Sequence, residues 1–159
     1  MAQAAIGSNI VKSPLYRYYN GRKKEHFYTT NAEEIGTTTC GLKGKYAYTS
    51  EGVACYISPN NLNGFLPLYR YCNGKDHFYT TNAHEIGTGK YGYKYEGIAG
   101  YTPPKNNNNP DIAPLYRYCN GKDHFYTTNA AEIGTTTPGL KGKYGHICEG
   151  IACYVFIRW

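Results

Sequence analysis

Residues 114–129 read PLYRYCNGKDHFYTTN, and residues 67–82 repeat the same sixteen letters. A third copy at residues 14–31, PLYRYYNGRKKEHFYTTN, has two extra residues in its middle. A second block of the form Glu-Gly-Val/Ile-Ala-x-Tyr follows each copy, at residues 51–56, 96–101 and 149–154. The chain therefore consists of three sequence repeats of one unit, and this repetition decides the fold.

The repeats span residues 14–57, 67–102 and 114–157, after a leader at 1–13 and separated by linkers at 58–66 and 103–113. The second linker is too polar and too rich in proline for regular structure. A chain of 159 residues is long enough for one hydrophobic core, so we expect a single domain over 1–159.

Each repeat opens with an aromatic strand, Leu-Tyr-Arg-Tyr, followed by Asn-Gly, a strong signal for a β-hairpin. The returning strand is His-Phe-Tyr-Thr-Thr. Alternation places His77 and Tyr79 on one face of that strand and Phe78 on the other. We expect the phenylalanine to be buried and the face with the histidine to be exposed.

A short helical turn comes next, where Asn31 precedes Glu34 by three residues, a capping-box arrangement that the other repeats share. Glu34, Glu85 and Glu132 are therefore interpreted as capping residues.

Two further strands close the unit, at 46–50 and 53–57 in the first repeat. In the last of them Val53, Cys55 and Ile57 share one face, so the cysteine is expected to be a small core side chain.

Four short strands in each of three repeats must bury faces that no single unit can bury alone. Closing the units about a pseudo-threefold axis also removes exposed strand edges. The sequence thus predicts an all-β fold, a β-trefoil of twelve strands, with a β-prism of three sheets as the alternative.

The six cysteines do not follow the repeats, since Cys55 and Cys153 correspond to Gly100. We expect free thiols, because a disulfide framework should recur with the unit that it holds together. No Cys-x-x-Cys or Cys/His metal spacing appears in the sequence. We therefore predict no metal and no cofactor.

The net charge of +6 is spread along the chain, which argues against a nucleic-acid partner. Residues 1–12 contain no apolar stretch of signal-peptide length, and no segment is apolar enough to span a bilayer. The prediction is a cytoplasmic protein without membrane insertion, which would need a non-classical route to reach the outside.

The pattern LYRY…DHFYTTNAxEIG…YEGIAGY resembles an uncharacterised repeat family that occurs next to secreted hydrolases and in small stand-alone proteins. All three repeats match it. More loosely, a small all-β protein of three repeats looks like the β-trefoil lectins, a likeness of fold only. The ricin-type Gln-x-Trp signature is absent, since the single tryptophan is Trp159.

One strand position carries a histidine in every repeat, next to a carboxylate and two residues before a tyrosine: Glu25, His26 and Tyr28; Asp76, His77 and Tyr79; Asp123, His124 and Tyr126. Such a set can contact a sugar, because an aromatic ring stacks on the CH face while polar groups bond hydroxyls. The plainer alternative is that His and Asp fix the hairpin turn by hydrogen bonds.

The first strand carries an arginine between tyrosines, at Arg17, Arg70 and Arg117. An ion pair with the glutamate of the second block (Glu51, Glu96 or Glu149), in the same or a neighbouring repeat, is the favoured interpretation. Recognition of a sugar hydroxyl or an anionic group is the alternative.

These residues favour a multivalent carbohydrate-binding protein, a lectin or hemagglutinin of glycans or glycoproteins, with up to three equivalent shallow sites. Repeat three provides the best single site, and repeat one departs through its longer turn. The alternatives are a protease inhibitor or other protein-interaction module that uses the second linker, and a glycosidase. No catalytic residue is predicted, because no asymmetric carboxylate pair stands out.

Overall fold

The structure is a computed structural model that describes residues 10–159. It confirms the all-β class, and most of the leader at 1–13 lies outside the described residues. The strands are β1 (Ser13–Asn20), β2 (Glu25–Thr29), β3 (Tyr48–Ile57), β4 (Leu66–Cys72), β5 (His77–Thr80), β6 (Lys94–Thr102), β7 (Ile112–Cys119), β8 (His124–Thr127) and β9 (Ile147–Phe156). The short 3-10 helices are η1 (Ala32–Glu34), η2 (Lys45–Ala47), η3 (Ala83–Glu85), η4 (Lys90–Gly92), η5 (Ala130–Glu132) and η6 (Lys143–Gly145).

Each repeat folds into one antiparallel unit of three strands, in the orders β2-β1-β3, β5-β4-β6 and β8-β7-β9. The predicted hairpins are confirmed as β1–β2, β4–β5 and β7–β8. In repeats two and three the turn places Gly74 and Gly121 at φ of 90° and 93°, a conformation that glycine adopts without strain.

The prediction of four strands per repeat is wrong, because its last two strands form one long, bulged strand. On β3, the partners of β1 run Leu15↔Cys55, then Tyr16↔Val53, so one extra residue enters the ladder there. This bulge turns Val53 to the solvent, where it is 45% exposed, while Cys55 is buried as predicted. The expected common face of Val53 and Cys55 is therefore wrong.

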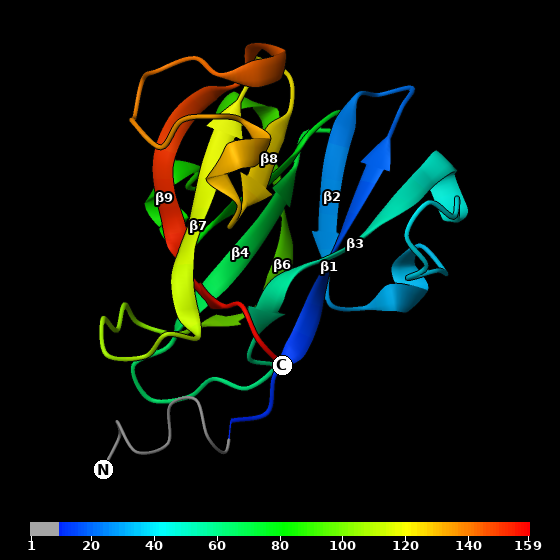
Figure 1. The fold of residues 1–159 in the computed structure, drawn as a ribbon. Coiled ribbons are helices and arrows are strands. Elements are labelled where there is room, and N and C mark those ends of the chain that lie inside the picture. The colour runs from blue at the N-terminus through cyan, green and yellow to red at the C-terminus, as the bar shows by residue number, and fades with distance from the viewer. Residues whose placement is uncertain (1–9) are drawn as a thin grey trace.

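The three units are related by a pseudo-threefold axis, because their HFYTT tyrosines bond one another in a closed ring, Tyr28 to Tyr126, Tyr126 to Tyr79 and Tyr79 to Tyr28. Figure 1 shows the units in blue to cyan, in green, and in yellow to red. Units one and three join into a six-stranded sheet through the pair Tyr56↔Phe156, and unit two is attached through the bridge Ser58↔Tyr101. Within residues 10–159 the strands form these two sheets and no closed barrel.

The central core draws side chains from all three units: Leu15, Leu68 and Leu115, Tyr28, Tyr79 and Tyr126, and Cys55, Ile57, Cys153 and Val155. Each unit adds a smaller aromatic cluster of its own, such as Tyr18, Phe27, Ile35 and Tyr48. No single repeat therefore contains a complete core. Among the described residues, no helix has the length and apolarity needed to cross a membrane.

Candidate functional site at the niches between repeats

The three tyrosines of the HFYTT segments meet on the axis and are each only 1% exposed. The Tyr28 hydroxyl donates to the carbonyl of Tyr126 at 2.8 Å and accepts from its N–H at 2.7 Å. Tyr79 bonds the backbone of Tyr28 in the same way, and Tyr126 that of Tyr79. Burial raises the pKa of all three phenols well above the usual value. The prediction that these tyrosines lie on an exposed face is wrong, because they close the core.

Each repeated histidine lies between two carboxylates that come from different repeats. His77 Nδ1 is 2.8 Å from Oε1 of the buried Glu25, and its Nε2 is 3.5 Å from Oε1 of Glu96. His26 lies in the same way between Asp123 at 2.6 Å and Glu51 at 3.4 Å. For His124 the partners are Asp76 at 2.5 Å and Glu149 at 3.6 Å.

The expected pairing of a histidine with the acidic residue before it is therefore wrong. Neighbouring residues on a strand point to opposite sides, so Asp76 reaches His124 of the next repeat, not His77. The histidine side chains are only 12–13% exposed, which contradicts the expected open face.

The predicted arginine–glutamate ion pairs are confirmed. Arg70 Nε lies 3.0 Å from Glu96, and the equivalent distances are 2.7 Å for Arg17–Glu51 and for Arg117–Glu149. The guanidinium of Arg70 also forks onto both oxygens of Glu34, at 2.9 and 3.1 Å, and lies 4.9 Å from the Phe27 ring.

The expectation for the glutamates of the helical turns needs correction. Asn31 does cap η1, accepting from the N–H of Glu33. Glu34, however, uses its carboxylate on Arg70 of the next repeat, with the Thr29 hydroxyl as a second partner. Burial alone would raise the pKa of Glu34, but the hydrogen bonds from Arg70 and Thr29 and the positive charge of Arg70 together outweigh it and lower the pKa.

Three equivalent sites, here called niches, follow from these contacts. Niche 1/2 holds Arg70, Cys72, His77 and Glu96 against Glu25, Phe27, Glu34 and Tyr48. Niche 2/3 holds Arg117, Cys119, His124 and Glu149 against Asp76, Phe78, Glu85 and Tyr93. Niche 3/1 holds Arg17, Tyr19, His26 and Glu51 against Asp123, Phe125, Glu132 and His146.

The niches hold their histidines in the charged form. Burial alone would lower the pKa of His77, but hydrogen bonds with Cys72, Glu25 and Glu96 outweigh it and raise the pKa to about 11. In the same way the pKa of His124 rises to about 10, chiefly through Asp76. An imidazolium that bridges two carboxylates is a clamp between repeats rather than a free base.

Niche 3/1 departs from the other two at the position of the buried tyrosine. Tyr48 and Tyr93 each donate a hydroxyl proton to the buried carboxylate of their niche. His146 stands in that position and lies 3.8 Å from Asp123 Oδ2, too far for a hydrogen bond. It is 5% exposed, and neither ring nitrogen has a hydrogen-bond partner among the described residues.

A cavity of about 460 Å³ opens at this niche. Its lining includes Arg17, His26 and Asp123, three of the predicted site residues, together with Tyr19, Glu51, Glu132, Lys143, Tyr144 and His146. His146, whose buried ring nitrogens have no hydrogen-bond partner among the described residues, lines this cavity.

An exposed tyrosine stands at each niche, two residues before Tyr48, Tyr93 or His146, and the sequence pattern does not predict it as a site residue. Tyr46, Tyr91 and Tyr144 are 75%, 80% and 78% exposed. Their φ values are 57°, 59° and 60°, in the left-handed region that is costly for a bulky residue. The Lys-Tyr pair that recurs in the three repeats is the sequence signal for these tyrosines, but the predicted strand at 46–50 includes the first of them.

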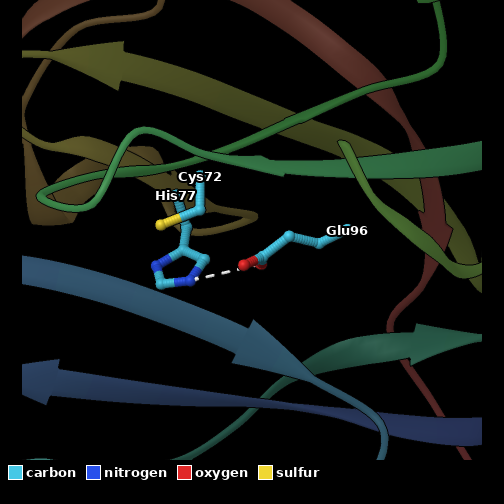
Figure 2. Close-up of side chains that lie close together, drawn as sticks. All are labelled: Cys72, His77 and Glu96. Atoms are coloured by element: carbon cyan, nitrogen blue, oxygen red, sulfur yellow. Dashed lines mark ion pairs between the residues drawn. The ribbon is translucent and has the colours of Figure 1, made fainter. Parts of the chain in front are cut away.

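Cysteines add a further group to two niches. Cys72 pairs with His77 across the β4–β5 hairpin, and Glu96 approaches from β6 (Figure 2). One ligand atom from each of these residues lies within 4.8 Å of the other two, and Cys119, His124 and Glu149 are grouped in the same way. In niche 3/1 Tyr19 takes the place of the cysteine. Thiol, imidazole and carboxylate together can hold a soft divalent metal.

A family model described as a domain of unknown function, DUF5648, matches residues 14–156. Searches of curated proteins and of solved structures found no match. Since the matched segment covers all three repeats, the chain belongs to the family of the domain of unknown function DUF5648.

Proposed function

We propose that the protein is a non-enzymatic carbohydrate-binding protein and that its principal site is the cavity of niche 3/1. The observation that carries the proposal is His146, buried beside this cavity with both ring nitrogens unpaired. A sugar hydroxyl both donates and accepts, so it can satisfy either nitrogen of the imidazole.

The groups around His146 suit a pyranose. Tyr144 offers an exposed ring on the rim, on which the CH face of a sugar can stack. Arg17 is held in place by Glu51 and Glu132. The N–H donors of the arginine and the carboxylate oxygens of the two glutamates are therefore already oriented to bond vicinal hydroxyls of a sugar. Because these side chains are already ordered in the free protein, little conformational entropy is lost when a ligand binds.

The other two niches serve as weaker sites on the same scheme. Tyr46 and Tyr91 stand at the positions of Tyr144, but hydroxyls of buried tyrosines already satisfy the carboxylates behind them. Linked sites on one rigid body gain affinity for a branched or clustered glycan through effective concentration. We therefore propose a multivalent lectin whose sites differ in affinity, in contrast to the three equivalent sites that the sequence predicts.

Binding without turnover is favoured by the state of the repeated histidines. Both ring nitrogens of His26 face carboxylates, Asp123 and Glu51, so this imidazole is not poised to take a proton from a nucleophile. The topology that we propose is nearer to the β-prism alternative than to the β-trefoil, because each repeat forms its own antiparallel unit of three strands, although units one and three also join edge to edge.

A glycan array on the purified chain, followed by calorimetry with the best saccharide, tests the proposal. Tyr144→Ala removes the stacking ring and should weaken the tighter site about three- to tenfold. His146→Tyr installs the residue of the other niches, whose hydroxyl reaches the buried carboxylate, and should abolish that site.

Tyr91→Ala is the matched control, since Tyr91 has the same exposure and backbone conformation in niche 2/3. It should leave the affinity of the tighter site unchanged. Absence of saccharide binding by the folded wild-type chain would refute the function. Full retention of binding by both the Tyr144→Ala and the His146→Tyr variants would refute the site.

A further inference from the structure

The cysteine, histidine and glutamate of niche 1/2 come from three neighbouring strands of one repeat. Cys72 and His77 face each other at the end of the β4–β5 hairpin. Glu96 lies where the β4–β6 register shifts between Arg70 and Tyr71, so it is the extra residue of a bulge. The bulge turns its carboxylate toward the imidazole, as Figure 2 shows.

The buried carboxylate of Glu25 already orients the imidazole of His77 through its Nδ1 atom. His77 Nδ1 lies 2.8 Å from Glu25, which leaves Nε2 directed at Glu96, 3.5 Å away. Histidines that bind a metal through one nitrogen almost always donate the other N–H to a carboxylate, a backbone carbonyl or water. The niche therefore contains the outer partner of a metal-binding histidine as well as three potential ligands.

We propose that niches 1/2 and 2/3 each bind one thiophilic divalent cation of the Zn²⁺ class. The ligands are Cys72 Sγ, His77 Nε2 and Glu96 in the first site, and Cys119 Sγ, His124 Nε2 and Glu149 in the second. Thiolate, imidazole and carboxylate are each zinc ligands, and three protein ligands leave the fourth tetrahedral position to water. Binding releases the thiol proton and the proton on Nε2 to solvent.

The site needs only local movement to accept the ion. Ligand atoms within 4.8 Å of one another must close to about 3.3–3.8 Å around a tetrahedral zinc. Cys72 is half-buried, its sulfur accepts the N–H of Gly74 at 3.3 Å, and it already lies beside the His77 ring, so a side-chain rotation can bring it in. Arg70 holds one oxygen of Glu96 through Nε, which leaves the second oxygen for the metal.

Niche 3/1 provides an internal negative control. As in the other niches, His26 has a carboxylate at each ring nitrogen, Asp123 at Nδ1 and Glu51 at Nε2. Its partner across the hairpin, however, is Tyr19 in place of a cysteine. The proposal therefore predicts two metal ions per chain rather than three.

Titration of the reduced, metal-free chain with Zn²⁺ against a chromophoric chelator tests the stoichiometry. Co²⁺ in place of Zn²⁺ reports sulfur ligation through its thiolate charge-transfer absorption. Wild type should bind two ions, and Cys72→Ser and Cys119→Ser should bind one each with the remaining site unchanged. The double variant should bind none, and Tyr19→Cys should bind a third.

Cys40→Ser is the control, because Cys40 is an exposed thiol outside the niches. It should still bind two ions, and a thermal melt by circular dichroism verifies that each variant is folded. Cobalt–thiolate absorption that survives in the Cys72→Ser/Cys119→Ser double variant would overturn the proposal. So would a folded wild type that produces no such absorption.

Discussion

At the scale of single residues, three tyrosine hydroxyls join the repeats at the axis. Each hydroxyl satisfies a buried N–H and a buried carbonyl of the preceding repeat around the ring, so it replaces the backbone pairing that a continuous sheet would supply. The rings also meet edge to face, with centroids 5.3–5.4 Å apart. The sequence predicts that the tyrosine of the HFYTT segment contacts a ligand, whereas in the structure it joins the repeats.

Tyr79→Phe should therefore be strongly destabilising although it removes a single oxygen. The N–H and carbonyl of Tyr28 would both lose their partner in a dry core, at a cost of about 2–4 kcal/mol in the free energy of unfolding. Urea unfolding measures the difference. Tyr91→Phe removes an exposed hydroxyl and should change stability by less than about 0.5 kcal/mol. Equal effects of the two substitutions would show that the hydroxyl network contributes nothing.

Much of the residue-level site could not be predicted, because its partners come from different repeats. The sequence places Asp76 beside His77, but strand alternation and the packing of units send them to different neighbours. The Arg70–Glu96 pair was predictable because both residues recur with the repeat. Linear spacing predicts no metal site, and it carries no information on Cys72 and Glu96, which approach His77 across strands.

At the scale of elements, the η2, η4 and η6 turns hold their tyrosines in a left-handed conformation. The hairpins and the Asn caps were predicted from Asn-Gly and Asn-x-x-Glu, which are local signals. The left-handed tyrosines and the bulges were not, since no local preference of Tyr or Val specifies them. Strain that recurs beside each niche is typical of functional surfaces.

Substitution at Tyr91 tests this strain through the sign of a stability difference. At an ordinary position alanine is more stable than glycine, but at a φ of 59° glycine avoids the Cβ clash. We expect Tyr91→Gly to be more stable than Tyr91→Ala by about 1 kcal/mol, measured by urea unfolding. The same pair of substitutions at the strand residue Thr49 should give the opposite order. An alanine variant that is the more stable one at both positions would exclude backbone strain at Tyr91.

At the scale of the whole molecule, the ring of repeats is closed by three imidazolium clamps. Arg17 and His26 of the first repeat bind Glu132 and Asp123 of the third, so the two ends of the chain are held together like any other neighbours. Each clamp places a positive ring against a buried carboxylate of the adjacent repeat. The stability of the whole assembly is thereby linked to the protonation of its histidines.

The linkage has a definite sign. An unfolded histidine titrates near 6.5, whereas the pKa values of His77 and His124 in the fold are about 11 and about 10. For both histidines burial lowers the pKa, and the groups that face the ring favour its charged form. These groups are Glu25, Glu96 and Cys72 for His77, and Asp76, Glu149 and Cys119 for His124. The stabilisation is complete below about pH 6.5 and is lost as the pH rises toward the folded values.

With a chelator present, the free energy of unfolding should fall between pH 7 and pH 9. Each histidine contributes a slope of up to about 1.4 kcal/mol per pH unit, because the folded state keeps a proton that the unfolded state has released. Urea unfolding at several pH values measures this slope. His77→Gln removes one titrating clamp, so its slope should be shallower by one histidine's share. A wild-type stability that is flat from pH 7 to pH 9 would mean that the rings are neutral in the fold, and the repeats would then be held by hydrogen bonds without charge.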